Sequence, residues 1–590
     1  MYIGTRVLWS GAVLAFALVA SADAPKAVDL SDLRDAITTA GKRGENVDDI
    51  KRALDALEKA LAKGGAAPKE AARAELAAVR RAVEAAARKG EKVDGIAKEL
   101  DDVEKALTGR VFVRMDKAQV SAFATEVLRG TDHLAQRAYR QVPVIELADR
   151  AVDGLYLAAG EAVPDEVKQE RARRPKGVAV DPRPLLEAAR DALGKRDDLA
   201  DSRDVLAALK HACGAFDEPT TALTPEAMTR MRSQQYQNGL GEVGVQLRRV
   251  TDRIEVVTPF KDGPAYKAGL RAGDIITQFK LFEDAQGKPL VAPTALTPAT
   301  LKAENTDGVL WGRVGARVEL TVARPGAKPV PLALTLARVK REGLVGHRRL
   351  ADDTWDYLLD EKLGVYYVRV LDFHRADLAN ELNLLLTKFE AQKIKSLVLD
   401  LRFAGSGLID TAVWVADVFV DNPLIVELRG RTSGAEKKMG RRTGSRLLFP
   451  VVCLTSGTSG TCPELVAACL QDHKRAVIVG ERTGGRASVQ NYFALERGTL
   501  RITTAHAYRP SGKPLDRDTA PADRPDEWGV TPDPGFAVEL TKPERDDLRD
   551  DLETRCTITH RDTPKRDAKE FKDRQLAKAL EHLREKAKQE

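Results

Sequence analysis

The stretch TSGTSGTCPELVAACLQDHKRAVIVGERTGGRASVQ, at residues 455–490, decides the fold. Glycines and small hydroxylated residues lead into an apolar segment at 463–473, and a short β-branched run and a Gly-Gly-Arg turn follow it. Pro463 suits the first turn of a helix, where the amide proton that proline lacks would have no intrahelical partner. The stretch therefore predicts a turn that presents a nucleophile at a helix N-terminus, with partner residues in the loop after the next strand.

Strands and helices alternate on both sides of this stretch. From residue 341 the predicted strands are 364–373, 396–403, 448–456, 475–481 and 499–509, and the predicted helices are 376–393, 411–420 and 463–473. Such alternation is typical of an α/β layer, in which helices cover a sheet. Residues 541–590 are mostly charged, and the amphipathic pattern at 573–588 predicts a terminal helix that packs back on the core.

The N-terminal region contains an internal repeat. Residues 43–64 reappear as 89–110, and in both copies the apolar positions follow helical spacing after a glycine. The matched positions are Gly44 and Gly90, Val47 and Val93, Ile50 and Ile96, Leu54 and Leu100, Leu57 and Val103, and Leu61 and Leu107. We expect two helical hairpins here, either as a solvated appendage or as a surface for a partner.

Further helices are predicted over residues 115–235, and short alternating strands with one short helix over 238–340. His211 and Cys213 lie on an apolar helix of the first region and are expected in its core, because no other His or Cys cluster accompanies them.

The first residues predict an export signal. Arg6 precedes the apolar run 7–20, and Ala20-Ser21-Ala22 supplies a small-x-small cleavage site. The run is short for a membrane span, so we expect cleavage near Ala22 and a periplasmic or cell-envelope protein, with an uncleaved anchor as the alternative.

Composition limits the partners. The chain has 94 Lys and Arg against 88 Asp and Glu, with no basic stripe, so we expect no nucleic acid. The five cysteines are scattered without CxxC spacing, which disfavours a zinc site and a disulfide framework, and we expect no metal or cofactor. A chain of 590 residues is too long for one core and predicts several domains.

Residues 200 to 585 resemble the carboxyl-terminal processing peptidases, or tail-specific proteases. The resemblance rests on 208–228, GPAYKAGLRAGD at 263–274, SLVLDLR at 396–402, 470–483, SVQ at 488–490, LRITTAHAYRPSGKPL at 500–515, GVTPD at 529–533 and QLAKALEHL at 575–583. It implies a multidomain α+β protein with a helical N-terminal region, a β-rich PDZ domain and an α/β crotonase/ClpP-like peptidase core. The expected boundaries are signal peptide 1–22, repeat hairpins 23–110, helical domain 111–237, PDZ domain 238–340, peptidase domain 341–540 and charged helical tail 541–590.

The family uses a serine nucleophile, a lysine general base and a glutamine that orients the lysine. Laid on this chain, the serine position is Thr461, the lysine position is Arg486, and the glutamine is Gln490. The backbone amides of Cys462 and Gly407 are the expected oxyanion donors. In the PDZ domain, the expected peptide-binding residues are Gly244, Val245, Gln246 and Leu247, because consecutive amides in a Gly-containing turn can hold a peptide carboxylate.

The departures from the family affect the proton acceptor. An arginine holds its proton at any physiological pH, so Arg486 cannot act as the base, although it can serve as a fixed cation. His473 lies at the far end of the predicted helix, about 15 Å from Thr461. Cys462 is an alternative nucleophile, although a buried thiol is favoured.

A second departure lies after the DLR strand, where Phe403 is expected to make the site bulkier and more apolar.

We therefore predict an exported PDZ-containing protein of the family that recognises polypeptide C-terminal tails or unfolded segments, with weak proteolysis or none. The alternative is an active serine-type endopeptidase that uses Thr461, Ser459 or Ser456. A third hypothesis is a scaffold whose helical repeats make the relevant contacts. The N- and C-terminal helices are candidates for self-association into a homo-oligomer.

Overall fold

The computed structural model describes residues 30–62, most of 75–108, 113–173, most of 180–228, 240–250, 253–283, 289–297, 310–324, 326–421, 423–441, 449–560 and 571–589. The predicted export signal lies outside the described residues. The described chain contains both helices and sheets, and it divides into two compact units. One unit holds residues 1–120, 156–177 and 187–200, and the other holds 121–155, 178–186 and 201–590.

The repeat region forms amphipathic helices: α1 (Ser31–Lys42), α2 (Asp48–Ala62) and α4 (Asp94–Thr108). The matched apolar positions of the two copies meet in one buried cluster, which includes Val47, Ile50, Leu54 and Leu57 with Val93, Ile96, Leu100 and Val103. Gly44 and Gly90 have φ values of 89° and 90°, a conformation that glycine adopts without steric cost. The predicted helical repeat is therefore confirmed, and the side chains of Leu61 and Leu107 lie outside the described residues.

Further helices follow, as predicted. They are α5 (Lys117–Arg137), α6 (Val144–Ala159), α7 (Asp165–Ala172), α8 (Arg183–Asp191), the 3-10 turn η1 (Asp197–Leu199) and α9 (Arg203–Cys213). Cys213 is buried, and burial raises the pKa of its thiol to about 12. His211 packs so closely on α6 that a Cβ atom on Gly154 would lie 2.3 Å from the His211 Cβ atom. Both residues are therefore packing residues.

The described residues between 240 and 339 form a β-rich body around one apolar core. Its main sheet has the order β3-β4-β5-β8-β9, and all of its pairs are antiparallel. The elements are β2 (Leu240–Glu242), β3 (Val245–Val250), β4 (Arg253–Pro259), α11 (Pro264–Lys267), β5 (Ile275–Glu283), β6 (Pro289–Leu296), β7 (Trp311–Arg313), β8 (Arg317–Ala323) and β9 (Val330–Thr335). Glu242 and Ala337 exchange backbone hydrogen bonds, so the chain enters and leaves this body at one place.

The α/β core is built on the predicted strands. Four parallel strands, β14 (Val365–Val370), β15 (Ser396–Asp400), β18 (Val451–Thr455) and β19 (Ala476–Gly480), lie in that order, with the short antiparallel β10 (Leu344–Val345) and β13 (Leu358–Asp360) beside β14. The connecting helices are α12 (Leu378–Ala391), α13 (Ile409–Asp417) and α14 (Cys462–Asp472). Their apolar side chains pack with those of the strands in one buried cluster. This agrees with the usual burial of a parallel sheet on both faces.

A second sheet adjoins the first. It has the order β1-β21-β16-β17, with β20 also paired to β21. Its strands are β1 (Thr221–Leu223), β16 (Leu424–Gly430), β17 (Gly434–Met439), β20 (Ser488–Leu495) and β21 (Gly498–Tyr508). Of these, only β21 coincides with a predicted strand. A two-stranded pair, β11 (Arg348–Arg349) and β12 (Trp355–Asp356), and the 3-10 turn η4 (Arg517–Thr519) complete the core.

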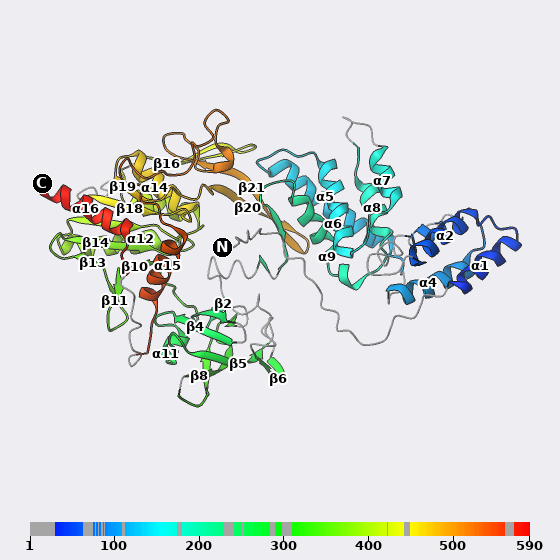
Figure 1. Ribbon diagram of the computed structural model, residues 1–590, viewed down its shortest axis with the longest axis horizontal. Coiled ribbons are helices and arrows are strands. Elements are labelled where there is room, and N and C mark those ends of the chain that lie inside the picture. The colour runs from blue at the N-terminus through cyan, green and yellow to red at the C-terminus, as the bar shows by residue number, and fades with distance from the viewer. Residues whose placement is uncertain are drawn as a thin grey trace, which may run out of the picture. The chain divides into compact units, whose positions relative to one another are not determined.

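The predicted C-terminal helix, α16 (Arg574–Gln589), packs back on the core, and a second helix, α15 (Lys542–Cys556), precedes it (Figure 1). Ala579 and Leu583 of α16, drawn in red, are buried against apolar side chains of β14, β15, β18 and β19. The fully buried Arg402, at the end of β15, donates to Asp400, to Asp573 and to the Gln575 side chain. This network ties the start of α16 to the parallel sheet.

A short segment after α15, here called the strap (residues 556–560), reaches the β-rich body. The Ile558 amide donates to the Thr258 hydroxyl at 3.1 Å, and the Ile558 carbonyl accepts from the Ala272 amide at 2.9 Å. His560 Nε2 lies 2.8 Å from Asp274 Oδ1, and Asp274 also pairs with Arg324. Ile558 is buried, so the strap is a packed contact.

Candidate active site

The predicted nucleophile turn lies between β18 and α14, at the carboxyl end of a central parallel strand, where α/β sheets commonly carry their sites. Several hydroxyls in this turn are bound within the fold. Ser459 is fully buried, and its hydroxyl donates to the Leu401 carbonyl at 2.9 Å. Ser456 is also buried, and its hydroxyl lies 3.0 Å from that of Thr458. Neither buried serine presents its oxygen to solvent.

Thr461 stands at the N-terminus of α14 in a strained conformation. Its φ of 46° and ψ of −93° are unusual for any residue other than glycine, and a β-branched side chain makes them more so. The Thr461 hydroxyl donates to the Arg486 carbonyl at 2.5 Å, and the Thr461 amide donates to the same oxygen at 3.0 Å. The structure therefore brings Thr461 and Arg486 together through the Arg486 backbone.

A buried carboxylate holds this contact in place. Glu464, three residues into α14, accepts from the amides of Thr461 at 2.9 Å, Gly485 at 2.6 Å and Arg486 at 3.0 Å. Burial raises the pKa of Glu464, although its hydrogen bonds act in the opposite direction. Because its partners are backbone amides and the Thr483 hydroxyl, Glu464 shapes the turn and is not aimed at a substrate.

Gln490 is bound elsewhere on the β20–β21 hairpin. Its side-chain amide donates to the Thr503 hydroxyl at 2.6 Å and to the Ser488 hydroxyl at 3.1 Å. Thr503 in turn donates to Asp217, in the segment between α9 and β1. The described hydrogen bonds of Gln490 therefore join the hairpin to the helical region and do not reach Thr461.

The residues expected to supply the oxyanion donors, Cys462 and Gly407, are linked through Leu408. The Cys462 thiol donates to the carbonyl of Leu408, the residue after Gly407, at 3.6 Å. Cys462 is fully buried, and burial, with the charge of Asp372, raises the pKa of its thiol well above the ordinary range. Cys462 is therefore the buried thiol that the sequence favours over a nucleophile. Gly407 forms a parallel bridge with Phe373.

Phe403 does not take the expected place. Its φ is 57°, and its ring packs against the apolar residues of α15, including Leu548 and Leu552. Arg549 of the same helix lies 5.4 Å from the ring centroid. The expectation that Phe403 fills the site is corrected, because the left-handed backbone turns the ring toward the C-terminal helix.

His473, which the sequence places far from Thr461, and a second histidine, His506, are engaged at other places. His473 Nε2 lies 2.8 Å from the Leu424 carbonyl, at the far end of α14 as predicted. His506 is buried opposite Ser488 on β21, and its Nδ1 lies 3.2 Å from an Asp516 carboxylate oxygen. Within the described chain, the hydrogen-bond partner of the Thr461 hydroxyl is a backbone carbonyl, which cannot accept its proton as a base does.

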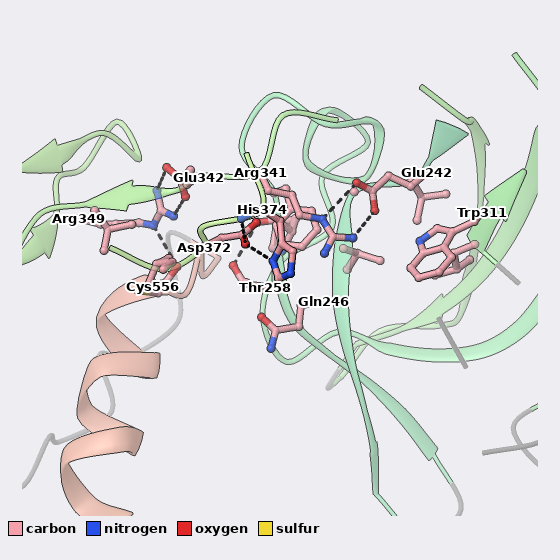
Figure 2. A pocket seen from close by; sticks show the side chains of 18 of the residues that line it. Glu242, Gln246, Thr258, Trp311, Arg341, Glu342, Arg349, Asp372, His374 and Cys556 are labelled. Atoms are coloured by element: carbon pink, nitrogen blue, oxygen red, sulfur yellow. Dashed lines mark hydrogen bonds and ion pairs between the residues drawn. The ribbon is translucent and has the colours of Figure 1, made fainter. Parts of the chain in front are cut away.

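A cavity of about 640 Å³ lies between the β-rich body and the core (Figure 2). Gly244, Val245 and Gln246 line it, whereas Leu247 packs on the core of the β-rich body. Gly244 has a φ of 74°, and a Cβ atom there would lie 3.0 Å from a Val339 methyl group. Two ion pairs border the cavity, Arg341 with Glu242 and Arg349 with Glu342. Three of the four expected peptide-binding residues therefore face one space.

Two other residues of this cavity, Asp372 and His374, were not singled out from the sequence, and Ser406, next to the expected oxyanion donor Gly407, also lines it. His374 Nδ1 lies 2.7 Å from Asp372 Oδ1. Their positions, just after the observed end of the parallel strand β14, are the signal that could have identified Asp372 and His374.

No metal-binding group of His, Cys, Asp and Glu occurs among the described residues. In the part of the chain that the structure describes, every helix is too short or too polar to cross a membrane.

Comparison with known proteins gives a family for the core. Residues 364–534 match the profile of Peptidase family S41. The "Carboxy-terminal-processing protease" of Bartonella bacilliformis is 32% identical over 314 residues, which cover 52% of this chain and 63% of that protein. The "Carboxyl-terminal-processing protease" of Picosynechococcus is 27% identical over 54% of this chain and 69% of its own length.

Among solved structures, the "Photosystem II D1 C-terminal processing protease" aligns over 68% of this chain and 94% of its own, at 21% identity and a TM-score of 0.34. The chain spans less than two thirds of the length of the Bartonella bacilliformis protein, and about half of the length of other curated relatives that it matches. Because residues 364–534 match the family profile, this chain carries a Peptidase family S41 domain. The sequence similarity over 314 residues shows that it is a relative of the carboxy-terminal-processing proteases.

Proposed function

We propose that this chain is an exported member of the carboxyl-terminal processing family that binds polypeptide C-terminal tails or unfolded segments, and that proteolysis at Thr461 is weak or absent. The observation that carries the proposal is the hydrogen bond from the Thr461 hydroxyl to the Arg486 carbonyl. The hydroxyl proton has no side-chain acceptor there, and the residue at the family's lysine position keeps its own proton at neutral pH.

Tail binding is supported by the architecture of residues 240–339, which we assign as a PDZ domain. Its strand β3 is at the edge of the sheet, and the turn before β3 contains Gly244 in the left-handed region. A peptide can add to such an edge strand while the amides of the turn hold its carboxylate. The turn also lines the 640 Å³ cavity, which offers room for the last side chains of a tail.

The alternative is an active endopeptidase that uses Thr461, and one observation favours it. A strained backbone at the residue that aligns with a nucleophile is common at catalytic turns, and Thr461 has such a backbone. A base would still have to replace the lysine, since the described partners of Thr461 and Gln490 do not include one.

The proteolysis proposal is tested with an unfolded protein substrate that ends in an apolar tail. We expect no fragments from the natural chain. The variant with Thr461→Ser and Arg486→Lys restores both family residues, and fragments from this variant alone would show that the rest of the site is intact. Fragments from the natural chain that disappear in Thr461→Ala would refute the proposal.

Tail binding is tested separately by titration of a labelled apolar tail peptide. Gly244→Val places a side chain in the turn and against Val339, and we expect at least tenfold weaker binding. Gly326→Val is the matched control, because Gly326 also has a positive φ but has open space around its Cβ position. An equal loss of tail-peptide binding in both variants would contradict the assignment of this turn as the carboxylate-binding turn of a PDZ domain.

The proposal also includes the domain boundaries given above, a location in the cell envelope, and self-association through the terminal helices. The location is tested by fractionation of cells that express the full chain, and self-association by sedimentation of the full chain. Monomers at every concentration would rule out the oligomer.

A further inference from the structure

The loops after the two neighbouring strands β14 and β15 bring three polar residues together. Asp372 and His374 follow β14, and Ser406 follows β15. Between them, Phe373 and Gly407 form a parallel bridge, and the Leu408 amide donates to the Phe373 carbonyl at 3.1 Å. Bridged parallel segments lie about 4.8 Å apart, so the residues next to the bridge are close neighbours.

The direction of the side chains follows from the same bridge. Successive side chains of an extended segment point to opposite sides. Phe373 is fully buried in the core, and a Cβ atom on Gly407 would lie 2.3 Å from the Phe373 Cβ atom. Asp372, His374 and Ser406 therefore point to the opposite side, and all three line the 640 Å³ cavity.

The imidazole of His374 is held in one orientation. Its Nδ1 lies 2.7 Å from Asp372 Oδ1, and its backbone amide donates to the same oxygen at 2.9 Å, as Figure 2 shows. Although burial favours the neutral acid, the bonds from His374 and the charge of Arg341 keep the pKa of Asp372 below its ordinary value. A carboxylate at Nδ1 fixes the proton on that nitrogen and leaves Nε2 as the acceptor.

Ser406 adds an exposed hydroxyl on the wall of the same cavity. It differs in this respect from Ser456 and Ser459, which are buried. A hydroxyl, an imidazole and a carboxylate that line one cavity are the parts of a nucleophilic acyl-transfer site, whatever the fold that carries them.

We propose that Ser406, His374 and Asp372 form a second acyl-transfer centre in the cavity, whose nucleophile and base are not Thr461 and Arg486. Its substrate is a carboxylic ester or amide with an apolar acyl group, because Val243, Phe260 and Leu371 line the same space. The proposal goes beyond the function proposed above and holds whether or not the cavity binds peptide tails.

The chemistry uses only these groups and water. The Ser406 oxygen attacks the carbonyl carbon, and its proton passes to His374 Nε2. The bond to the leaving alcohol or amine then breaks, and His374 returns the proton to the leaving group, so that an acyl-serine remains. Water attacks the acyl-serine while His374 takes a proton from it, and that proton returns to the Ser406 oxygen as the acid leaves.

The test is phosphonylation of the full chain by a small alkyl fluorophosphonate, followed by peptide mapping with mass spectrometry. We expect the label on Ser406. His374→Gln should slow the labelling about 100-fold, because a positioned base contributes about that much or more. Asp372→Asn should slow it less, and Ser511→Ala, at an exposed serine outside the cavity, should leave it unchanged.

Absence of a label on Ser406 in the natural chain, with or without a label on Thr461, would overturn the proposal without any variant. Equal labelling of Ser406 in the natural chain and in His374→Gln would also overturn it. Tail-peptide binding, measured on the same samples, reports separately on the function proposed above and on whether the variants are folded.

Discussion

Replacement of Asp573 should detach the C-terminal helix α16 from the sheet. The Asp573 carboxylate accepts from Arg402 at 3.0 and 2.8 Å, and from the Leu576 amide at 2.9 Å. The side chain of Arg402 has 0% exposure and that of Asp573 has 8%, so Asp573→Ala leaves two guanidinium protons buried without this acceptor.

The magnitude follows from these contacts. Removal of one partner of a buried ion pair costs about 3–5 kcal/mol, and the lower end applies here because Asp400 still neutralises Arg402. Loss of the helix cap adds about 1 kcal/mol. Since about 1.4 kcal/mol is a factor of ten, the equilibrium for local opening of α16 should increase at least 100-fold.

The assay is amide hydrogen exchange of peptides from 574–589, because a chain with two compact units need not unfold in one step. Asp573→Asn keeps a cap and a neutral acceptor and should give a smaller effect. Asp547→Ala, at an exposed acid on α15, is the control and should give none. Unchanged exchange of α16 in Asp573→Ala would refute the assignment of Arg402 and Asp573 as its main anchor.

Three further predictions concern single contacts. The Thr541 amide, the Arg574 guanidinium and the Thr541 hydroxyl lower the pKa of Glu544 from 4.5 to about 2, so the contact between α15 and α16 is complete above pH 4.5 and is lost as pH falls toward 2. Glu544→Gln should abolish that pH dependence in hydrogen exchange of α16. Gly485→Ala should lower the midpoint temperature of thermal unfolding, because Gly485 has a φ of 64° and a Cβ atom there would lie 2.4 Å from the Trp528 ring. An unchanged midpoint would contradict the geometry of this turn. Cys556 should react with iodoacetamide before the other four cysteines, which are buried, and equal rates would contradict the assigned burial.

Much of the core could be predicted because its local patterns are unambiguous. The strands that became β14, β15, β18 and β19 are short apolar runs between helical segments, as expected for a buried parallel sheet. The hairpin strand β20 was not predicted, since residues 488–495 mix polar and apolar side chains on a half-exposed strand.

The positions of the candidate site residues along the chain could be predicted, but the orientations of their side chains could not. The alignment paired Thr461 with Arg486, and the two residues do meet, but through the Arg486 carbonyl and not its guanidinium. Nothing in the local sequence indicates that Phe403 adopts a positive φ or that Thr503 binds Gln490 on one side and Asp217 on the other. Such orientations depend on residues far away in the chain.

The strap has a mechanical consequence for the β-rich body. The body is joined covalently to the core at its two ends, and these ends meet at Glu242 and Ala337, so by themselves they would act as one pivot. The strap holds the body at a second place, through Thr258 and Ala272. The Tyr266 hydroxyl, which donates to Asp353 at 2.8 Å, adds a further contact with the core. A body held at several separate places resists rotation, so a swing of this body away from the core must pull Ile558 out of its buried position.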